Sequence, residues 1–314
     1  MVTRAFVFPG QGSQAVGMGQ ALAEAFPAAR ELFEEVDEAL KQRLTKLMRE
    51  GPESELTLTE NAQPALMAVS LAVLRVLERE MGHRLGDVAA LVAGHSLGEC
   101  SALAAAGAFT VSDAARLLKR RGQAMQRAVP VGKGAMAALI GADLEQAEAI
   151  AKDAAQGEVC TPANDNAPGQ VVVSGHTSAV ERAVALASER GIKRAIMLPV
   201  SAPFHCPLMQ PAAEELAEAL AELPVLPPVV PLIANVTAAP VKDPETIRRL
   251  LVEQVTALVR WRESVLAMKE AGVDTIVELG SGKVLSGLAK RIDRDLTAIS
   301  AGTPAELETL AKTL

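Results

Sequence analysis

Apolar and polar residues follow two different periods along this chain, and these periods predict strands and helices that alternate. Short apolar runs bounded by glycine, proline or asparagine are typical of buried strands, whereas apolar positions three or four residues apart are typical of amphipathic helices. Outside the middle of the chain, the predicted strands are residues 5–8, the run that ends at Gly94, 229–233 and 274–279. The predicted helices there are the segment that ends at Leu40, 64–77, the Ala/Leu-rich run after Gly98, 110–125, 212–223 and segments from Pro244 and Arg262. This mixture predicts an α/β protein.

The pattern changes between Val131 and Val200, where the predicted elements are shorter. They run strand, helix, strand, strand, helix, strand, at 134–140, 144–156, 158–160, 170–174, 178–190 and 194–200, with a loop at 164–169. This order is typical of a ferredoxin-like unit. We therefore expect a small subdomain at 131–199, inserted into a large domain formed by 1–130 and 200–314. Ligands often bind in clefts between such units.

Composition and charge narrow the class of function. The chain has 314 residues, enough for a full hydrophobic core without disulfides or metals to support it. Its formal net charge is −7, and it contains six Phe, one Trp and no Tyr. Proteins that bind nucleic acids use basic surfaces and aromatic stacking platforms. We therefore expect no nucleic-acid partner.

Cysteine usage and the longest apolar run indicate the compartment. Three scattered cysteines, an odd number, suit a reducing environment, and no paired-cysteine or His-Glu-x-x-His motif indicates a metal site. The segment from Met1 to Phe8 has no signal-peptide core, and the apolar run at 66–77 is interrupted by Arg75. We expect a cytoplasmic protein without a membrane anchor.

A G-x-S-x-G sequence joins the strand that ends at Gly94 to the helix that follows. It comprises Gly94, His95, Ser96, Leu97 and Gly98. A strand that turns directly into a helix strains the residue at the apex, and glycines two positions away on either side avoid collisions. The Ser96 hydroxyl would then stand clear of the sheet, and the Leu97 N–H at the helix start would face an oxyanion. A turn that contains serine by chance is the alternative, but the flanking strand and helix favour a nucleophile.

Two other glycine-rich turns resemble phosphate-binding motifs only in part. Gly10 and Gly12 have the spacing of a dinucleotide fingerprint, but residues 27–40 are helical and charged where that fingerprint needs a second strand ending in an acid. We therefore reject nucleotide binding and expect this loop to supply a backbone N–H, from Gln11, to an oxyanion. The turn at 280–283 lacks essential residues of a phosphate loop and is interpreted as a strand-to-helix connection.

The helix predicted at 110–125 carries an arginine on its apolar face. Arg121 lies four residues after Leu117 and four residues before Met125. Leaving a buried guanidinium without its counter-charge costs about 3–5 kcal/mol. Arg121 therefore either pairs with an internal Asp or Glu, or receives a carboxylate from a substrate, for which its planar fork is suited. The basic residues expected on the solvated face are Arg116, Lys119, Arg120 and Arg127.

Four histidines compete for the role of general base. They are His83, His95, His176 and His205. We favour His205, because it lies between prolines on a loop at the predicted junction of the two units and could reach Ser96. The side chain of His95 should point away from its neighbour Ser96, which favours a structural role. Gln63, just before the helix at 64–77, is interpreted as a cap-region residue, with a position in the site as the alternative.

Several motifs, taken in order, resemble those of malonyl-CoA:acyl carrier protein transacylases. They are Phe8-Pro-Gly-Gln-Gly-Ser-Gln14, Asn61-Ala-Gln-Pro-Ala65, Gly94-His-Ser-Leu-Gly-Glu99, Arg121-Gly122, Pro168-Gly-Gln170, Ala202-Pro-Phe-His205, Gln254 ahead of Val259-Arg-Trp261, and Glu278-Leu-Gly-Ser-Gly-Lys283. The resemblance covers nearly the whole chain. It implies an α/β-hydrolase-like large domain with a ferredoxin-like insert, which agrees with the predicted order of elements.

The resemblance also implies a role for each residue of the site. Ser96 would be the nucleophile that malonyl-CoA acylates, and His205 the general base and acid. The backbone N–H groups of Gln11 and Leu97 would form the oxyanion hole. Arg121 would bind the malonyl carboxylate, which is one of the two alternatives that its position leaves open.

In this family a main-chain carbonyl orients the imidazole in place of an acidic side chain, and that position matches Gln254. Gln63, His95, Asn166 and Phe204 are candidates for lining the cleft. A phenylalanine before the histidine often accompanies malonyl specificity, whereas a smaller residue often accompanies branched acyl groups. The implied partners are malonyl-CoA and an acyl carrier protein that brings its own phosphopantetheine. We expect a monomer without a bound cofactor or metal.

Three other functions remain as alternatives. A malonyl or acyl transferase of a polyketide pathway would share every motif. A serine esterase would share the G-x-S-x-G turn but hydrolyse its acyl-enzyme. A carrier-protein docking module would need only the basic face formed by Arg116, Lys119, Arg120 and Arg127, and would form no acyl-serine.

Overall fold

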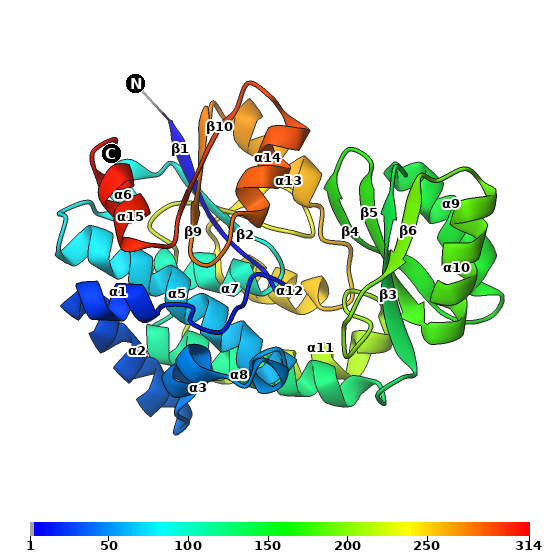
Figure 1. Cartoon of the computed structure of the whole chain (residues 1–314), viewed down its shortest axis with the longest axis horizontal. Coiled ribbons are helices and arrows are strands. Elements are labelled where there is room, and N and C mark those ends of the chain that lie inside the picture. Colours follow the sequence, from blue (N-terminus) through cyan, green and yellow to red (C-terminus); the bar gives the residue numbers. More distant parts are fainter. Residues whose placement is uncertain (1–2) are drawn as a thin grey trace.

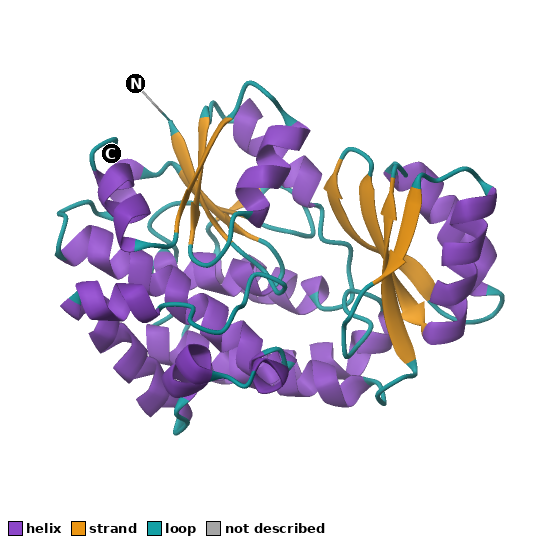
Figure 2. Cartoon of the chain, viewed as in Figure 1, coloured by secondary structure: helices purple, strands orange, loops and turns teal. Residues whose placement is uncertain are grey.

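Two β-sheets, each covered by its own helices, form the framework of the protein (Figures 1 and 2). The structure is a computed structural model that describes residues 3–314. Met1 and Val2, at the start of the segment from which we expected no signal peptide, lie outside the described residues. The chain has a mixed α/β fold, as predicted. No helix in the described part is both long enough and apolar enough to cross a bilayer.

The larger sheet has six strands in the order β10-β9-β1-β2-β7-β8. These strands are β1 (Arg4–Phe8), β2 (Leu91–Gly94), β7 (Leu232–Ile233), β8 (Pro240–Val241), β9 (Thr275–Leu279) and β10 (Thr297–Ala301). All pairs are parallel except β7 with β8. Parallel strands covered on both faces are nearly continuously apolar, which is why Ala5–Phe8 of β1 was recognisable in the sequence.

Helices cover both faces of this sheet. They are α1 (Gln20–Ala25), α2 (Pro27–Leu40), α3 (Leu44–Glu50), α4 (Glu53–Leu56), α5 (Thr59–Arg79), α6 (Leu85–Val88), α7 (Leu97–Ala105), α8 (Val111–Ala128), α11 (Gln210–Glu222), α12 (Pro244–Gln254), α13 (Trp261–Glu270), α14 (Val284–Ile292) and α15 (Pro304–Ala311). Alternate residues of β1 point to opposite faces. Phe6 and Phe8 therefore pack into the cluster with α5, α7 and α8, whereas Ala5 and Val7 pack against α13 and α14.

The smaller sheet has four antiparallel strands in the order β4-β5-β3-β6 (Figure 1, right). They are β3 (Gly134–Ile140), β4 (Cys160–Ala167), β5 (Gln170–His176) and β6 (Arg194–Met197). The helices α9 (Leu144–Ala155) and α10 (Thr177–Glu189) cover one face of this sheet. The alternate residues Met136 and Ala138 of β3 point the other way and join the core cluster of the larger unit.

The structure corrects the predicted strands around this unit. The expected strand at 158–160 and loop at 164–169 are replaced by β4, which continues to Ala167. Pro162 and the polar residues after it are typical of a loop, but β4 is an edge strand whose register shifts at two places, where proline is tolerated. Its other edge pairs with Val259, which accepts a hydrogen bond from the Asp165 N–H. The strands expected at 194–200 and 229–233 are shorter, as β6 and β7.

Two helix boundaries also differ from the prediction. The helical segment that ends at Leu40 is broken at Phe26, whose extended backbone separates α1 from α2. The helix expected from Pro64 begins at Thr59, so Pro64 lies inside α5. Tertiary packing explains this start, because α8 presses against the first turns of α5. A Cβ atom on Gly122 would lie 2.6 Å from the Glu60 Cα atom, so only glycine permits the close approach.

Candidate active site

The turn between β2 and α7 holds Ser96 in a strained conformation. Ser96 has φ 53° and ψ −112°, in a region that L-residues rarely adopt. The glycines on either side are required by close contacts. A Cβ atom on Gly94 would lie 1.9 Å from the Gly98 carbonyl, and one on Gly98 would lie 2.2 Å from the Phe8 carbonyl oxygen. The structure therefore has the strand-turn-helix geometry that the sequence motif predicts.

Ser96 lies within hydrogen-bonding distance of the histidine that the sequence favoured. Its Oγ is 2.8 Å from His205 Nε2. His205 Nδ1 is 2.9 Å from the main-chain oxygen of Gln254, at the end of α12, so this nitrogen donates and Nε2 is left to accept. His205 also has a positive φ, 56°, on the loop that leaves the smaller sheet. The serine, the imidazole and the orienting carbonyl thus come together as expected.

The surroundings of His205 keep its imidazole neutral. Burial, reinforced by the nearby charge of Arg121, lowers the pKa of His205 to about 3, although the Gln254 carbonyl opposes this shift. A neutral imidazole whose Nε2 faces a hydroxyl can accept its proton. The site therefore contains a base that is available throughout the neutral pH range.

Arg121 points into the same site from α8, and only 3% of the residue is exposed. Its Nη1 donates to Gln63 Oε1 at 2.7 Å, and its Nη2 donates to Gln254 Oε1 at 2.9 Å and to Ser96 Oγ at 3.2 Å. Within residues 3–314 no carboxylate forms an ion pair with this guanidinium. The direct internal salt bridge, one of the two alternatives for Arg121, is therefore absent. Burial lowers the pKa of Arg121 from its ordinary value.

The cap-region interpretation of Gln63 is wrong. Because α5 begins at Thr59, Gln63 lies within the helix and is buried, with its amide oxygen bonded to Arg121. The sequence favoured a cap because Pro64 is typical of a first helical turn.

A cavity of about 480 Å³ opens over Ser96. Its lining includes the expected residues Gln11, Gln63, His95, Ser96, Leu97, Arg121, Phe204 and His205, together with Met136 and Asn164 from the smaller sheet. The cavity therefore lies between the two units. Asn166 is not part of the lining, but its Oδ1 is 2.8 Å from His95 Nε2. The ring of His95 also packs against Trp261, with centroids 5.7 Å apart.

Two backbone N–H groups of this cavity have no acceptor among residues 3–314. Neither Gln11 N nor Leu97 N donates a hydrogen bond to another residue of the described chain. Leu97 begins α7, where the first N–H groups of a helix are free. Both groups are thus available to an oxygen atom bound above Ser96.

Sequence reasoning missed two buried polar residues behind the catalytic turn. Asn235, after β7, accepts a hydrogen bond from the Ser96 N–H at 2.9 Å and donates to the Gly94 carbonyl at 2.7 Å. Glu99, in the first turn of α7, lies beneath the same turn and is 1% exposed. Glu99 is part of the conspicuous Gly94–Glu99 motif, but an acid in a first helical turn is also what the helix dipole favours.

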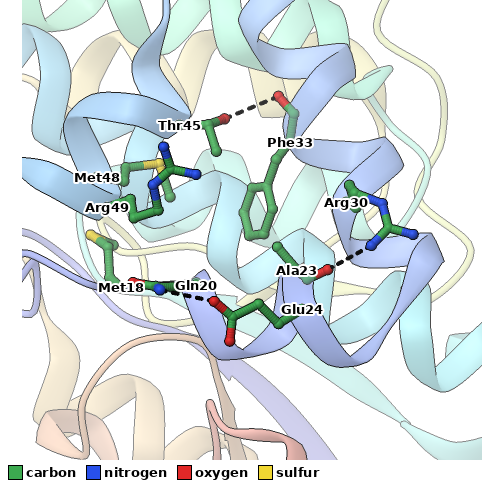
Figure 3. Close-up of a pocket in the computed structure, with 10 residues that line it drawn as sticks. Met18, Gln20, Ala23, Glu24, Arg30, Phe33, Thr45, Met48 and Arg49 are labelled. Atoms are coloured by element: carbon green, nitrogen blue, oxygen red, sulfur yellow. Dashed lines mark hydrogen bonds between the residues drawn. The ribbon is translucent and has the colours of Figure 1, made fainter.

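Four further cavities, formed by other parts of the described chain, contain none of the expected site residues. One lies among α1, α2 and α3, lined by Met18, Phe33 and Met48 with Arg30 and Arg49 at its edge (Figure 3). His83 lies in the loop after α5, and His176 ends β5, where its Nδ1 accepts from the Val159 N–H. No group of three or more His, Cys, Asp or Glu side chains in residues 3–314 could hold a metal ion.

Comparisons with known proteins agree with this geometry. The acyl transferase domain family matches residues 5–294. A malonyl CoA-acyl carrier protein transacylase of Bacillus subtilis is 47% identical over 99% of this chain and 96% of its own length. The crystal structure of an acyl-carrier-protein S-malonyltransferase from Bartonella henselae is 55% identical, covers 99% of both chains and superposes with a TM-score of 0.97.

A third match is a malonyl-transacylase in complex with a type II PKS acyl-carrier protein. It is 44% identical, with a TM-score of 0.96, over 99% of this chain and all of its own length. These matches span the whole chain and share its fold. The chain belongs to the acyl transferase family and, within it, to the malonyl-CoA:acyl carrier protein transacylases.

Proposed function

We propose that this protein transfers the malonyl group of malonyl-CoA to the phosphopantetheine thiol of an acyl carrier protein, for fatty-acid synthesis. The observation that carries the proposal is the convergence of Ser96, His205 and Arg121 on one cavity. Ser96 and His205 make a nucleophile and its base, whereas Arg121 is a buried cation without a carboxylate partner. A thioester substrate that ends in a carboxylate has a carbonyl carbon for Ser96 to attack and a negative charge to pair with Arg121.

In the first half of the proposed cycle, His205 Nε2 accepts the Ser96 proton while Oγ attacks the thioester carbonyl. The N–H groups of Gln11 and Leu97 bind the oxyanion of the tetrahedral intermediate, each donor contributing about 3 kcal/mol. The carbon–sulfur bond then breaks, and the departing CoA sulfur takes the proton from His205. Malonyl-Ser96 remains. The Gln254 carbonyl stabilises the imidazolium that forms in between.

The second half reverses these steps with a different thiol. The phosphopantetheine thiol of the carrier protein gives its proton to His205 and attacks malonyl-Ser96, and Ser96 recovers the proton as it leaves. This ping-pong cycle uses no metal and no cofactor held by the chain. Arg121 binds the malonyl carboxylate in both halves, so acetyl groups, which leave the guanidinium unpaired, are disfavoured.

The finer description of the fold is part of the same proposal. We describe 131–199 as a ferredoxin-like subdomain inserted in an α/β-hydrolase-like domain formed by 1–130 and 200–314. The strand order β4-β5-β3-β6, with α9 and α10 on one face, supports the first description, and the sharp turn at Ser96 after a parallel strand supports the second. We also propose that the protein acts as a monomer in the cytoplasm.

The basic face required by a docking module is not a free basic surface. Each of its residues pairs with an acid: Arg116 with Asp113, Lys119 with Glu60, Arg120 with Glu215, Glu218 and Glu222, and Arg127 with Glu215. Their charges are largely compensated within the molecule. This observation disfavours a purely electrostatic docking function for that face.

The experiment that tests the proposal compares malonyl-CoA alone with malonyl-CoA plus a holo acyl carrier protein. We expect at most one equivalent of CoA thiol per enzyme without the carrier, and continuous release with malonyl-carrier protein as product when the carrier is present. Continuous release without the carrier would identify an esterase and overturn the proposal.

Carrier proteins of fatty-acid and polyketide synthesis, offered together, test the pathway. Preferential loading of the polyketide carrier would replace the fatty-acid assignment by a polyketide one. This second assignment is tested because a malonyl-transacylase that binds a type II PKS acyl-carrier protein is among the similar structures.

A further inference from the structure

Glu99 is a buried acid to which the catalytic cycle gives no role. It lies in the first turn of α7, is 1% exposed, and has no ion-pair partner within residues 3–314. Its carboxylate accepts hydrogen bonds from the Gln254 side-chain amide, by a short contact, and from the Asn235 N–H at 3.4 Å. Burying a carboxylate with so few donors is costly, so its presence beneath the nucleophile calls for a physical explanation.

The contact with Gln254 determines which way the Gln254 amide faces. The Nε2 group of this side chain is surrounded by acceptors, namely Glu99 Oε2, Ser96 O at 3.0 Å and Asn235 Oδ1 at 3.2 Å. Its Oε1 must then face the other way, where it accepts from Arg121 Nη2 at 2.9 Å. Glu99 is the acceptor among these that can carry a full charge, and hydrogen bonds to charged acceptors are the stronger ones.

Glu99 and Arg121 are therefore linked through the amide of Gln254, without touching each other. The guanidinium donates to one end of the Gln254 amide, and the other end donates to the carboxylate. The other side chains that accept from the guanidinium, Gln63 and Ser96, are neutral. A direct carboxylate contact would have neutralised Arg121, whereas a relayed contact holds its position and leaves its charge for a ligand.

We propose that Glu99 is a positioning residue which, through the Gln254 amide, holds Arg121 toward the carboxylate of the acyl group and so sets the preference for malonyl over acetyl. This inference rests on the proposed function, because it takes Arg121 as the group that binds the malonyl carboxylate. It assigns to Glu99 an effect on the choice of acyl group, beyond any effect on folding.

The test compares Glu99→Gln with the unaltered enzyme, using malonyl-CoA and acetyl-CoA as substrates and a holo carrier protein as acceptor. Glutamine keeps the size of the side chain but removes the carboxylate that accepts from the Gln254 amide, so Gln254 and with it Arg121 are held less firmly. We expect kcat/KM for malonyl-CoA to fall about tenfold, mainly through a rise in KM, and that for acetyl-CoA to change less than about threefold. Equal losses for the two substrates, or no loss for either, would overturn the proposal.

Ser101→Ala is the matched control. Ser101 is a buried polar residue on the same helix, and its hydroxyl has no hydrogen-bond partner in the described part of the chain. Its replacement should leave kcat/KM for both substrates unchanged.

If Glu99→Gln does not fold, Gln254→Ala tests the same link between Glu99 and Arg121 (the relay) by removing the amide in its middle, since the main-chain carbonyl that orients His205 is kept. It should show the same selective loss for malonyl, and an equal loss for both substrates would contradict the relay.

A double-mutant cycle separates the relay from independent effects. When Gln254 is already alanine, adding Glu99→Gln should change the malonyl-to-acetyl ratio by less than about twofold, because the relay is already broken. A further tenfold change would mean that Glu99 acts by another route and would overturn the proposal. Arg121→Ala, measured in the same assays, distinguishes failure of the proposed Arg121 clamp from failure of the proposed role of Glu99. If it leaves the malonyl preference intact, the proposed clamp itself fails; if it abolishes the preference while Glu99→Gln leaves the preference unchanged, only the role of Glu99 fails.

Discussion

The two sheets contribute to the cavity in physically different ways. The parallel sheet supplies groups at sharp chain reversals: Ser96 follows β2 with a positive φ, and Gln11 follows β1 with a free backbone N–H. The antiparallel sheet supplies Met136 and Asn164 from within its strands β3 and β4. The difference indicates that the parallel sheet and its helices position the proposed reacting groups, whereas the antiparallel sheet forms part of the cavity wall.

His205 connects these two contributions. It lies on the loop that leaves the smaller sheet, yet the carbonyl that orients it belongs to Gln254 at the end of α12 in the larger unit. A displacement of one unit relative to the other would therefore change the distance between the His205 ring and Ser96. Substitutions that remove reacting groups should lower the rate for every acyl group, and substitutions in the smaller sheet should chiefly weaken binding.

The largest effect is expected for His205→Ala. It removes the base that accepts the Ser96 proton, so acyl transfer from malonyl-CoA and acetyl-CoA should both fall about 10⁴-fold, as measured by steady-state kinetics. His176→Ala is the control in the smaller sheet, because it removes a histidine whose partner is the Val159 N–H, and the rate should be unchanged. A His205→Ala enzyme that retained a tenth of its activity would contradict the assignment.

The next largest effect is expected for Arg121→Ala, and it should depend on the substrate. Removing the guanidinium should lower kcat/KM for malonyl-CoA about 100-fold, the value of a charge-assisted pair of about 2–3 kcal/mol, and that for acetyl-CoA less than about threefold. Arg120→Ala, which removes the neighbouring ion-paired residue of the surface, should change neither. Equal losses for both acyl groups would rule out the clamp.

A smaller effect is expected for Asn166→Ala on β4. The substitution removes the oxygen 2.8 Å from His95 Nε2, and His95 lines the cavity. Losing one buried hydrogen bond should raise KM for both acyl-CoA substrates about three- to tenfold and leave kcat nearly unchanged. A hundredfold fall in kcat would mean that the antiparallel sheet takes part in the chemistry and would remove the distinction between the sheets.

The smallest effect is expected when pH is varied with acetyl-CoA, whose transfer does not involve a carboxylate on Arg121. Neutral His205 is the active form, and it is lost only as pH falls through its folded pKa of about 3. The acylation rate should therefore change less than about twofold between pH 8 and pH 5, in rapid-mixing experiments. A histidine with the ordinary pKa of about 6.5 would lose about 30-fold over that range, and such a loss would contradict the buried, neutral imidazole.

Much of this arrangement could be predicted because its signals are local. Gly94 and Gly98 lie two residues on either side of Ser96, the spacing that one sharp turn requires. Arg121 is recognisable because it is a charged residue on the apolar face of α8. Thr110 precedes α8, and its side chain accepts from the Asp113 N–H and so caps the helix. The pairing of Ser96 with His205 was favoured by the position of a loop, and the resemblance to a family supplied the roles.

The parts that were missed depend on contacts between distant segments. Gln63 was placed outside its helix, because no local pattern shows that α8 packs against the first turns of α5. Residues 164–167 of β4 were expected to be a loop, because no local pattern shows that this polar segment pairs with Val259 from another part of the chain. Glu99 and Asn235 meet Gln254 only in the folded protein.

The most direct test of the central claim is to identify the residue that carries the acyl group. The enzyme is mixed with malonyl-CoA without a carrier protein, quenched in acid, digested and examined by peptide mass spectrometry. We expect one malonyl group on Ser96, absent from Ser96→Ala and lost when a holo acyl carrier protein is added before the quench. A malonyl group on Cys100 or any other residue, or carrier loading without malonyl-Ser96, would contradict the proposed reaction.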